Sequence, residues 1–80
     1  MTHLEARIRR RLFGLADVRL FYCGSLVFEG HDVVKFRHTG NRVNIWIPWH
    51  HDDRRGVVKW SFAPIDEVRI TRRYNQGEVS

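Results

Sequence analysis

Large apolar side chains recur at every fourth position near the start of the chain. Leu4, Ile8 and Leu12 lie at positions i, i+4 and i+8, and Phe13 and Leu15 widen this stripe at its end. The spacing follows the turn of an α-helix, so it predicts an amphipathic helix over about residues 2–14. We expect its apolar stripe to pack on the core, with the arginines at positions 7, 9, 10 and 11 at the sides and back.

Both ends of this helix carry suitable capping residues. Thr2 and Glu5 have the spacing of a capping box, in which the two residues satisfy each other's free backbone N–H groups. Gly14 can adopt the left-handed backbone conformation that commonly ends a helix. The sequence therefore predicts where the helix begins and ends as well as its type.

After Gly14 the hydrophobic period changes to 2, which is the period of a β-strand. Predicted strands lie at about residues 17–23, 26–30, 33–38, 42–49, 57–62 and 67–72, with turns at 24–25, 30–32, 39–41 and 64–66 and a polar loop at 50–56. This order predicts an α+β fold, an N-terminal helix followed by a five- to six-stranded antiparallel sheet that is strongly bent or barrel-like. We expect one domain, residues 1–80, with strands over about 17–73 and a frayed tail at 74–80.

The alternation sorts the strand residues onto two faces. One set is almost entirely apolar and is expected to form the core: Val34, Phe36, Val43, Ile45, Ile47, Trp49, Val58, Trp60, Phe62, Val68 and Ile70. The other set gathers cations around Phe21 and Trp46, and it supplies the candidate residues for binding a partner or a nucleic acid: Arg19, Lys35, Arg37, Arg42, Trp46, Lys59 and Arg69. Whether these residues are neighbours depends on the order of the strands, which the alternation does not specify.

The charge of the chain is basic and comes mainly from arginine. Lys and Arg number 14 against 9 Asp and Glu, a net charge of +5, and twelve of the cations are Arg. Arginine binds phosphate and carboxylate groups through two parallel hydrogen bonds, so this bias fits a nucleic acid or an acidic protein as partner. A GC-rich genome would give the same bias through codon usage, and composition alone does not separate the two explanations.

Trp46 is the informative aromatic residue, because its phase in the strand places it among the cations. It would either shield a neighbouring strand or lie under aliphatic arginine stems, or contact a base or a side chain of a partner. The run from His50 to Asp53 invites interpretation as a metal site. Adjacent residues of a strand point to opposite faces, however, and no known ligand spacing is present, so we interpret the run as a polar turn without metal.

Candidates for catalysis are weak. Cys23 lies beside a predicted turn without a partner motif, and Asp66 and Glu67 are adjacent and therefore diverge. We expect no enzymatic activity and no cofactor. Because one cysteine cannot form an internal disulfide, and because no apolar run has the length of a membrane span or a signal peptide, we expect a cytoplasmic protein without membrane contact. A monomer is favoured, with an oligomer as the alternative.

The order of elements, with its leading helix, the strands "VRLFYCGSLVFEG" and "VVKFRHTG" and the terminal "PIDEVRI", resembles that of Sm-like and other small SH3-like barrels. The resemblance implies a short helical turn at Pro64 to Glu67 before the last strand, and RNA or peptide binding, often as a ring.

As a compact, arginine-rich single domain without a catalytic motif, the chain also resembles the small anti-CRISPR proteins of phages and mobile elements, above all inhibitors of type I systems such as type I-C. This resemblance implies a stoichiometric inhibitor that docks on a CRISPR effector complex and blocks target DNA. The sequence therefore favours a non-catalytic binding protein, either an inhibitor of this kind or a general RNA- or DNA-binding module.

Overall fold

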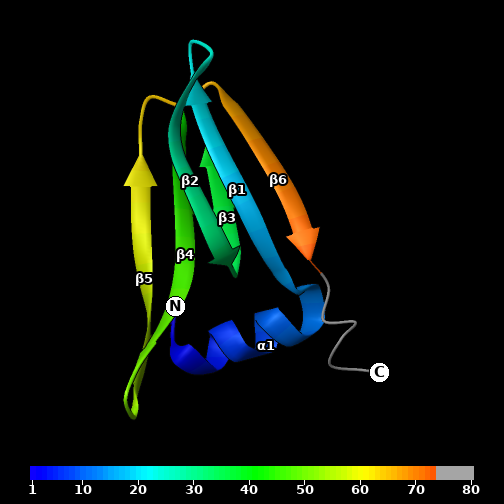
Figure 1. The fold of residues 1–80 in the computed structure, drawn as a ribbon, viewed down its shortest axis with the longest axis vertical. Helices are drawn as coiled ribbons and strands as arrows, with labels where there is room; N and C mark the ends of the chain where they lie inside the picture. The colour runs from blue at the N-terminus through cyan, green and yellow to red at the C-terminus, as the bar shows by residue number, and fades with distance from the viewer. Residues whose placement is uncertain (74–80) are drawn as a thin grey trace.

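The structure, a computed structural model, describes residues 1–73, so the predicted frayed tail at 74–80 lies outside the described residues. Helix α1 (His3–Phe13) is followed by six strands: β1 (Leu15–Tyr22), β2 (Ser25–Val33), β3 (Lys35–Thr39), β4 (Arg42–His51), β5 (Arg54–Phe62) and β6 (Glu67–Arg73) (Figure 1). The predicted α+β class, with an N-terminal helix and antiparallel strands, is confirmed. No helix within residues 1–73 combines the length and the apolar character needed to cross a membrane.

The strands form two three-stranded antiparallel sheets instead of one bent or barrel-like sheet, so that part of the prediction was wrong. Sheet A has the order β2-β1-β6 and sheet B the order β3-β4-β5. The chain passes from sheet A to sheet B at Val34, which is buried and whose N–H donates to the carbonyl of Trp46 at 3.0 Å. A single residue thus links β2 of sheet A to β3 of sheet B. The two sheets are connected through the chain but are not closed into a barrel.

The turn predicted at residues 30–32 is a β-bulge inside β2. Ala16 pairs with Val33 and Val18 pairs with Gly30, so β2 has one residue more than β1 over this interval. Asp32 takes a positive φ of 60° there. A bulge bends its strand. The residues Gly30 and Asp32 that suit this bend are also typical of turns, which is why the sequence indicated a turn although β2 continues to Val33.

The core lies between the two sheets. Val18 and Leu20 on β1 and Val43 and Ile45 on β4 have no exposed surface, and they form one cluster with other buried residues. Phe28 of sheet A stacks on Phe62 of sheet B with ring centroids 4.5 Å apart. The predicted core positions of β4 are therefore confirmed as far as Ile47, which packs against this cluster.

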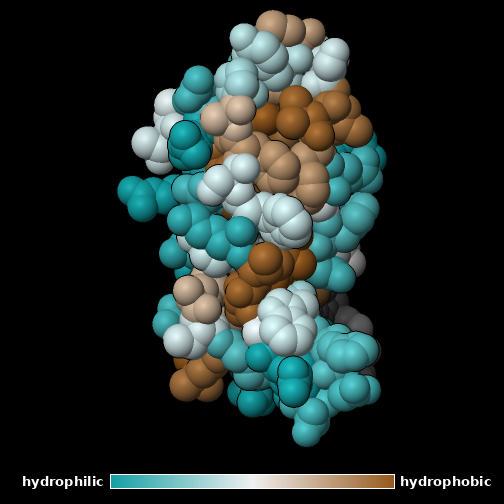
Figure 2. All heavy atoms as spheres, turned by 90° about the vertical axis from the view of Figure 1, so that its left-hand side faces the viewer, coloured by the Kyte–Doolittle hydropathy of each residue, from teal (hydrophilic) through white to brown (hydrophobic). Residues whose placement is uncertain are grey.

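The prediction that Trp49 and Trp60 are core residues was wrong. They are 45% and 48% exposed. Trp60 lies on β5, an edge strand that pairs only with β4. Figure 2 shows hydrophobic residues at the surface among hydrophilic ones on the side where β5 forms the edge. The indole of Trp49 covers Gly56 on the neighbouring strand, where a Cβ atom would lie only 2.6 Å from Nε1 of Trp49.

The connection between β5 and β6 closes the end of the core opposite α1 (Figure 1). Ile65 is 1% exposed, and its N–H donates to the carbonyl of Asn41 at 2.7 Å. Residues 63–66 contain no helical turn, so the turn implied by the resemblance to small barrels is absent, whereas β6 follows as predicted. The side chain of Ile65 therefore covers this end of the core, and its backbone hydrogen bond to Asn41 holds the connection in place.

Helix α1 begins and ends where predicted. The hydroxyl of Thr2 accepts from the N–H of Glu5 at 3.1 Å, and Gly14, with φ of 76°, donates its N–H to the carbonyl of Arg10 at 2.9 Å. These two contacts are the N-cap and C-cap that the sequence indicated.

The apolar stripe of α1 does not face the core, which corrects the prediction. Leu4, Ile8 and Leu12 are 64%, 50% and 67% exposed, whereas Ala6 is 3% exposed. Ala6 and Ile8 are two residues apart, about 200° around the helix, so the buried side is opposite the stripe. Arg9 secures this orientation, because its Nε donates to the carbonyl of Val34 at 3.3 Å.

We predict that Leu20→Ala lowers the free energy of unfolding by about 2–5 kcal/mol, because it leaves a cavity in the fully buried part of the core. Leu12→Ala, the same change on the exposed stripe, should stay within about 0.5 kcal/mol. Urea unfolding followed by circular dichroism measures both. An equal loss of stability in the two variants would show that the stripe is buried.

Candidate binding face

The outward side of sheet B carries a row of three residues from three strands. Lys35 on β3 pairs with Trp46 on β4, and Trp46 pairs with Lys59 on β5. Directly opposed residues of neighbouring strands project from the same side of a sheet. The three side chains therefore lie next to one another, although they are far apart in the sequence.

The two lysines hold the indole of Trp46 between them. Nζ of Lys35 lies 4.8 Å and Nζ of Lys59 5.6 Å from the Trp46 ring centroid, both within the range of a cation–π contact. The indole of Trp46 therefore lies among cations, as its phase in the strand predicted. Lys35 and Trp46 are half-buried and Lys59 is exposed.

Two arginines extend this row. Arg37 pairs with Asn44, which also accepts a hydrogen bond from Ser61, and Arg42 follows at the β3–β4 turn, where it pairs with Thr39. Both arginines are exposed. We call this surface the basic face and define it by Lys35, Arg37, Arg42, Trp46 and Lys59.

The basic face has no internal counter-charge. The outward positions of β3, β4 and β5 contain no Asp or Glu. Within residues 1–73, none of the four cations of the basic face forms an ion pair. Like charges on a surface without carboxylates produce a positive potential that attracts anions.

The other two predicted binding residues lie on sheet A, away from the basic face. Nε of Arg19 is 3.4 Å from a carboxylate oxygen of Glu29, and Nε of Arg69 is 2.6 Å from one of Glu67. Arg69 also covers the ring of Phe21, at 4.7 Å from its centroid. The structure thus brings five of the seven predicted residues together and places Arg19 and Arg69 where carboxylates balance their charge.

The predicted loop at residues 50–56 is the end of a long hairpin. β4 continues to His51, β5 begins at Arg54, and only Asp52 and Asp53 form the turn. His50 pairs with Arg55 and His51 with Arg54, so the two histidines are successive residues of one strand. Among residues 1–73, no three His, Cys, Asp or Glu side chains gather in a way that could hold a metal ion.

The longer hairpin reveals a cation that the sequence interpretation missed. Arg55 lies four residues before Lys59 on β5 and therefore has the same outward phase. The alternation could have identified it, but it was not extended through the charged run that was interpreted as a loop.

Cys23 lies in the tight turn between β1 and β2. It is exposed, has a φ of 52°, and donates its backbone N–H to Oδ2 of Asp66 at 2.9 Å. The negative charge of the Cys23 thiolate raises the pKa of the Tyr22 phenol above its ordinary value of 10.0, and a side-chain hydrogen bond to Cys23 and the charge of Asp66 act in the same direction.

Comparisons of the chain with protein-family models, with curated proteins and with solved structures find no match. The candidate site is therefore interpreted from its own residues.

We predict that Cys23→Asn lowers the pKa of Tyr22 toward its ordinary value, because the replacement removes the thiolate and keeps a residue suited to the turn. Absorbance of the phenolate at alkaline pH, measured in a Tyr74→Phe background, isolates Tyr22, one of two tyrosines. Asp66→Asn should have a smaller effect in the same direction. An unchanged midpoint in Cys23→Asn would contradict the assignment.

Proposed function

We propose that this chain is a non-catalytic binding protein that docks the basic face on a polyanionic surface. The observation that carries the proposal is the row of Lys35, Trp46 and Lys59, flanked by two arginines and without a carboxylate on the same face. Binding to an anionic partner supplies the counter-charge that this surface lacks.

The arrangement favours contact with phosphate or carboxylate groups over stacking of a base on Trp46. Both lysines already interact with the indole ring, so a base would have to displace a favourable contact. The ring instead orients the ammonium groups and restricts their freedom, which lowers the entropy that is lost when they bind anions. Electrostatic docking through the lysines and arginines follows from this geometry.

Such a partner can be a protein complex that carries nucleic acid. In the role implied by the resemblance to anti-CRISPR proteins, the basic face docks on a type I CRISPR effector complex, where it occupies an acidic surface or the guide RNA and blocks the binding of target DNA. In the alternative role, the basic face binds free RNA or DNA. The two roles use the same residues and differ in their dependence on salt and on Trp46.

We predict that Lys35→Gln with Lys59→Gln weakens binding to a short DNA duplex and lowers the slope of log affinity against log salt by about 2, because each lysine neutralises about one phosphate. Arg19→Gln with Arg69→Gln changes the net charge equally and should leave the slope nearly unchanged. Fluorescence anisotropy over a series of salt concentrations measures this. Equal slopes in the two double variants would show that only net charge matters.

We further predict that Arg37→Glu with Arg42→Glu abolishes inhibition of a purified type I effector complex, measured as its binding to target DNA, while circular dichroism shows an intact fold. Protein docking also predicts that Trp46→Ala costs about 2 kcal/mol or more of binding free energy. Docking on duplex phosphates predicts a steep salt dependence and little effect of Trp46. Undiminished binding to DNA and to the effector complex by the charge-reversal variant would remove the basic face from consideration.

A further inference from the structure

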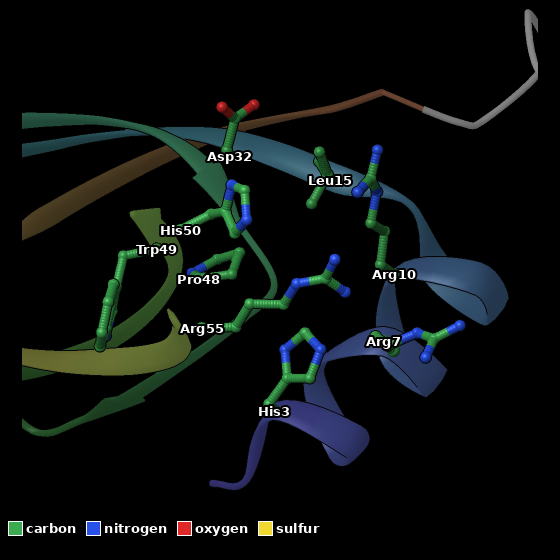
Figure 3. A pocket seen from close by; sticks show the side chains of 9 residues that line it. All are labelled: His3, Arg7, Arg10, Leu15, Asp32, Pro48, Trp49, His50 and Arg55. Atoms are coloured by element: carbon green, nitrogen blue, oxygen red, sulfur yellow. The ribbon is translucent and has the colours of Figure 1, made fainter. Parts of the chain in front are cut away.

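A second concentration of positive charge lies outside the basic face, around an open hollow of about 740 Å³ between α1 and the β4–β5 hairpin. Figure 3 shows the side chain of Arg55 pointing from β5 toward α1. The polar side chains that line the hollow are His3, Arg7, Arg10, Asp32, His50 and Arg55, and the remaining lining residues are apolar.

The helical residues of the hollow share one side of α1. His3, Arg7 and Arg10 follow the spacing i, i+4 and i+7, which places them on one face of a helix. This face is neither the exposed apolar stripe nor the opposite buried side at Ala6. Three guanidinium groups and two imidazoles therefore surround the hollow, against one carboxylate, that of Asp32.

Both walls of the hollow are held by contacts outside it. The hydrogen bond from Arg9 to the carbonyl of Val34 ties α1 to the point where the chain changes sheets. On the other wall, the paired residues His50 and Arg55 lie next to Trp49 and Gly56, where the indole covers the glycine. Both walls of the hollow are thus tied to neighbouring parts of the fold.

We propose that this hollow binds a phosphate group. Arg7 and Arg10 line the hollow from the helix and Arg55 lines it from the hairpin, so guanidinium groups belong to two of its sides. A tetrahedral oxyanion can accept from several sides at once, whereas a carboxylate offers two oxygens in one plane. Arginine forms two parallel hydrogen bonds to phosphate and keeps its charge at all relevant pH values. The site uses none of the five residues that define the basic face, although Arg55 has the same outward phase on β5 as Lys59, and it does not depend on the function proposed for that face.

Pyrophosphate is the probe, titrated by calorimetry at constant ionic strength and followed in parallel by thermal unfolding, because a ligand that binds only the folded state raises its Tm. We expect saturable binding to the wild-type chain. Arg7→Gln with Arg55→Gln should weaken it about tenfold or more, since each substitution removes a charge-assisted contact. Each single variant should show part of the loss.

Arg11→Gln is the matched control, because Arg11 lies on the same helix and does not line the hollow. It should bind pyrophosphate like the wild type, and so should Lys35→Gln with Lys59→Gln, which tests the basic face separately. An equal loss in the Arg11 variant, or no saturable binding by the wild type, would overturn the proposal.

A single-stranded oligonucleotide then identifies the source of the phosphate. If the Arg7 and Arg55 substitutions weaken the oligonucleotide together with pyrophosphate, the hollow holds a phosphate of a nucleic-acid backbone. If only pyrophosphate binding falls, the hollow holds a small phosphorylated ligand. Either result supports the site. Unchanged binding of both probes would remove it.

Discussion

The packing of β1 against β4 across the two sheets is the contact on which the rest of this structure depends. Val18 and Leu20 meet Val43 and Ile45 in the fully buried layer. Because β1 is the middle strand of sheet A and β4 the middle strand of sheet B, every other strand is hydrogen-bonded to one of these two. Burial of apolar surface contributes about 25 cal/mol per Å². At this layer it provides most of the driving force available to so small a domain.

The same layer creates the basic face. Once Val43, Ile45 and Ile47 point inward, the residues between them must point outward, which places Asn44 and Trp46 on the far side of sheet B. The register with β3 and β5 then places a lysine on either side of Trp46. The proposed binding surface is in this sense the reverse side of the core.

The charges of the chain differ between the two sheets. On sheet A, arginines lie against Glu29 and Glu67 and their charge is balanced. On sheet B, the cations of the basic face have no such partners among residues 1–73. The crossing at Val34 anchors Arg9, and through it the helix that supplies one wall of the phosphate hollow that we propose.

The sequence by itself determined the local structure. The capping residues Thr2 and Gly14 marked the helix, and alternation located the strands and the inward side of β4 up to Ile47, because these features depend on near neighbours in the chain. Contacts between distant segments decided the rest. The period of Leu4, Ile8 and Leu12 predicted a helix, but only the docking of Ala6 and Arg9 decided that this stripe faces outward. Alternation likewise assigned Arg19 and Arg69 the same phase as Lys35, and only the division into two sheets separated them, because a period of 2 tells which side of a strand a residue occupies and not which sheet the strand joins.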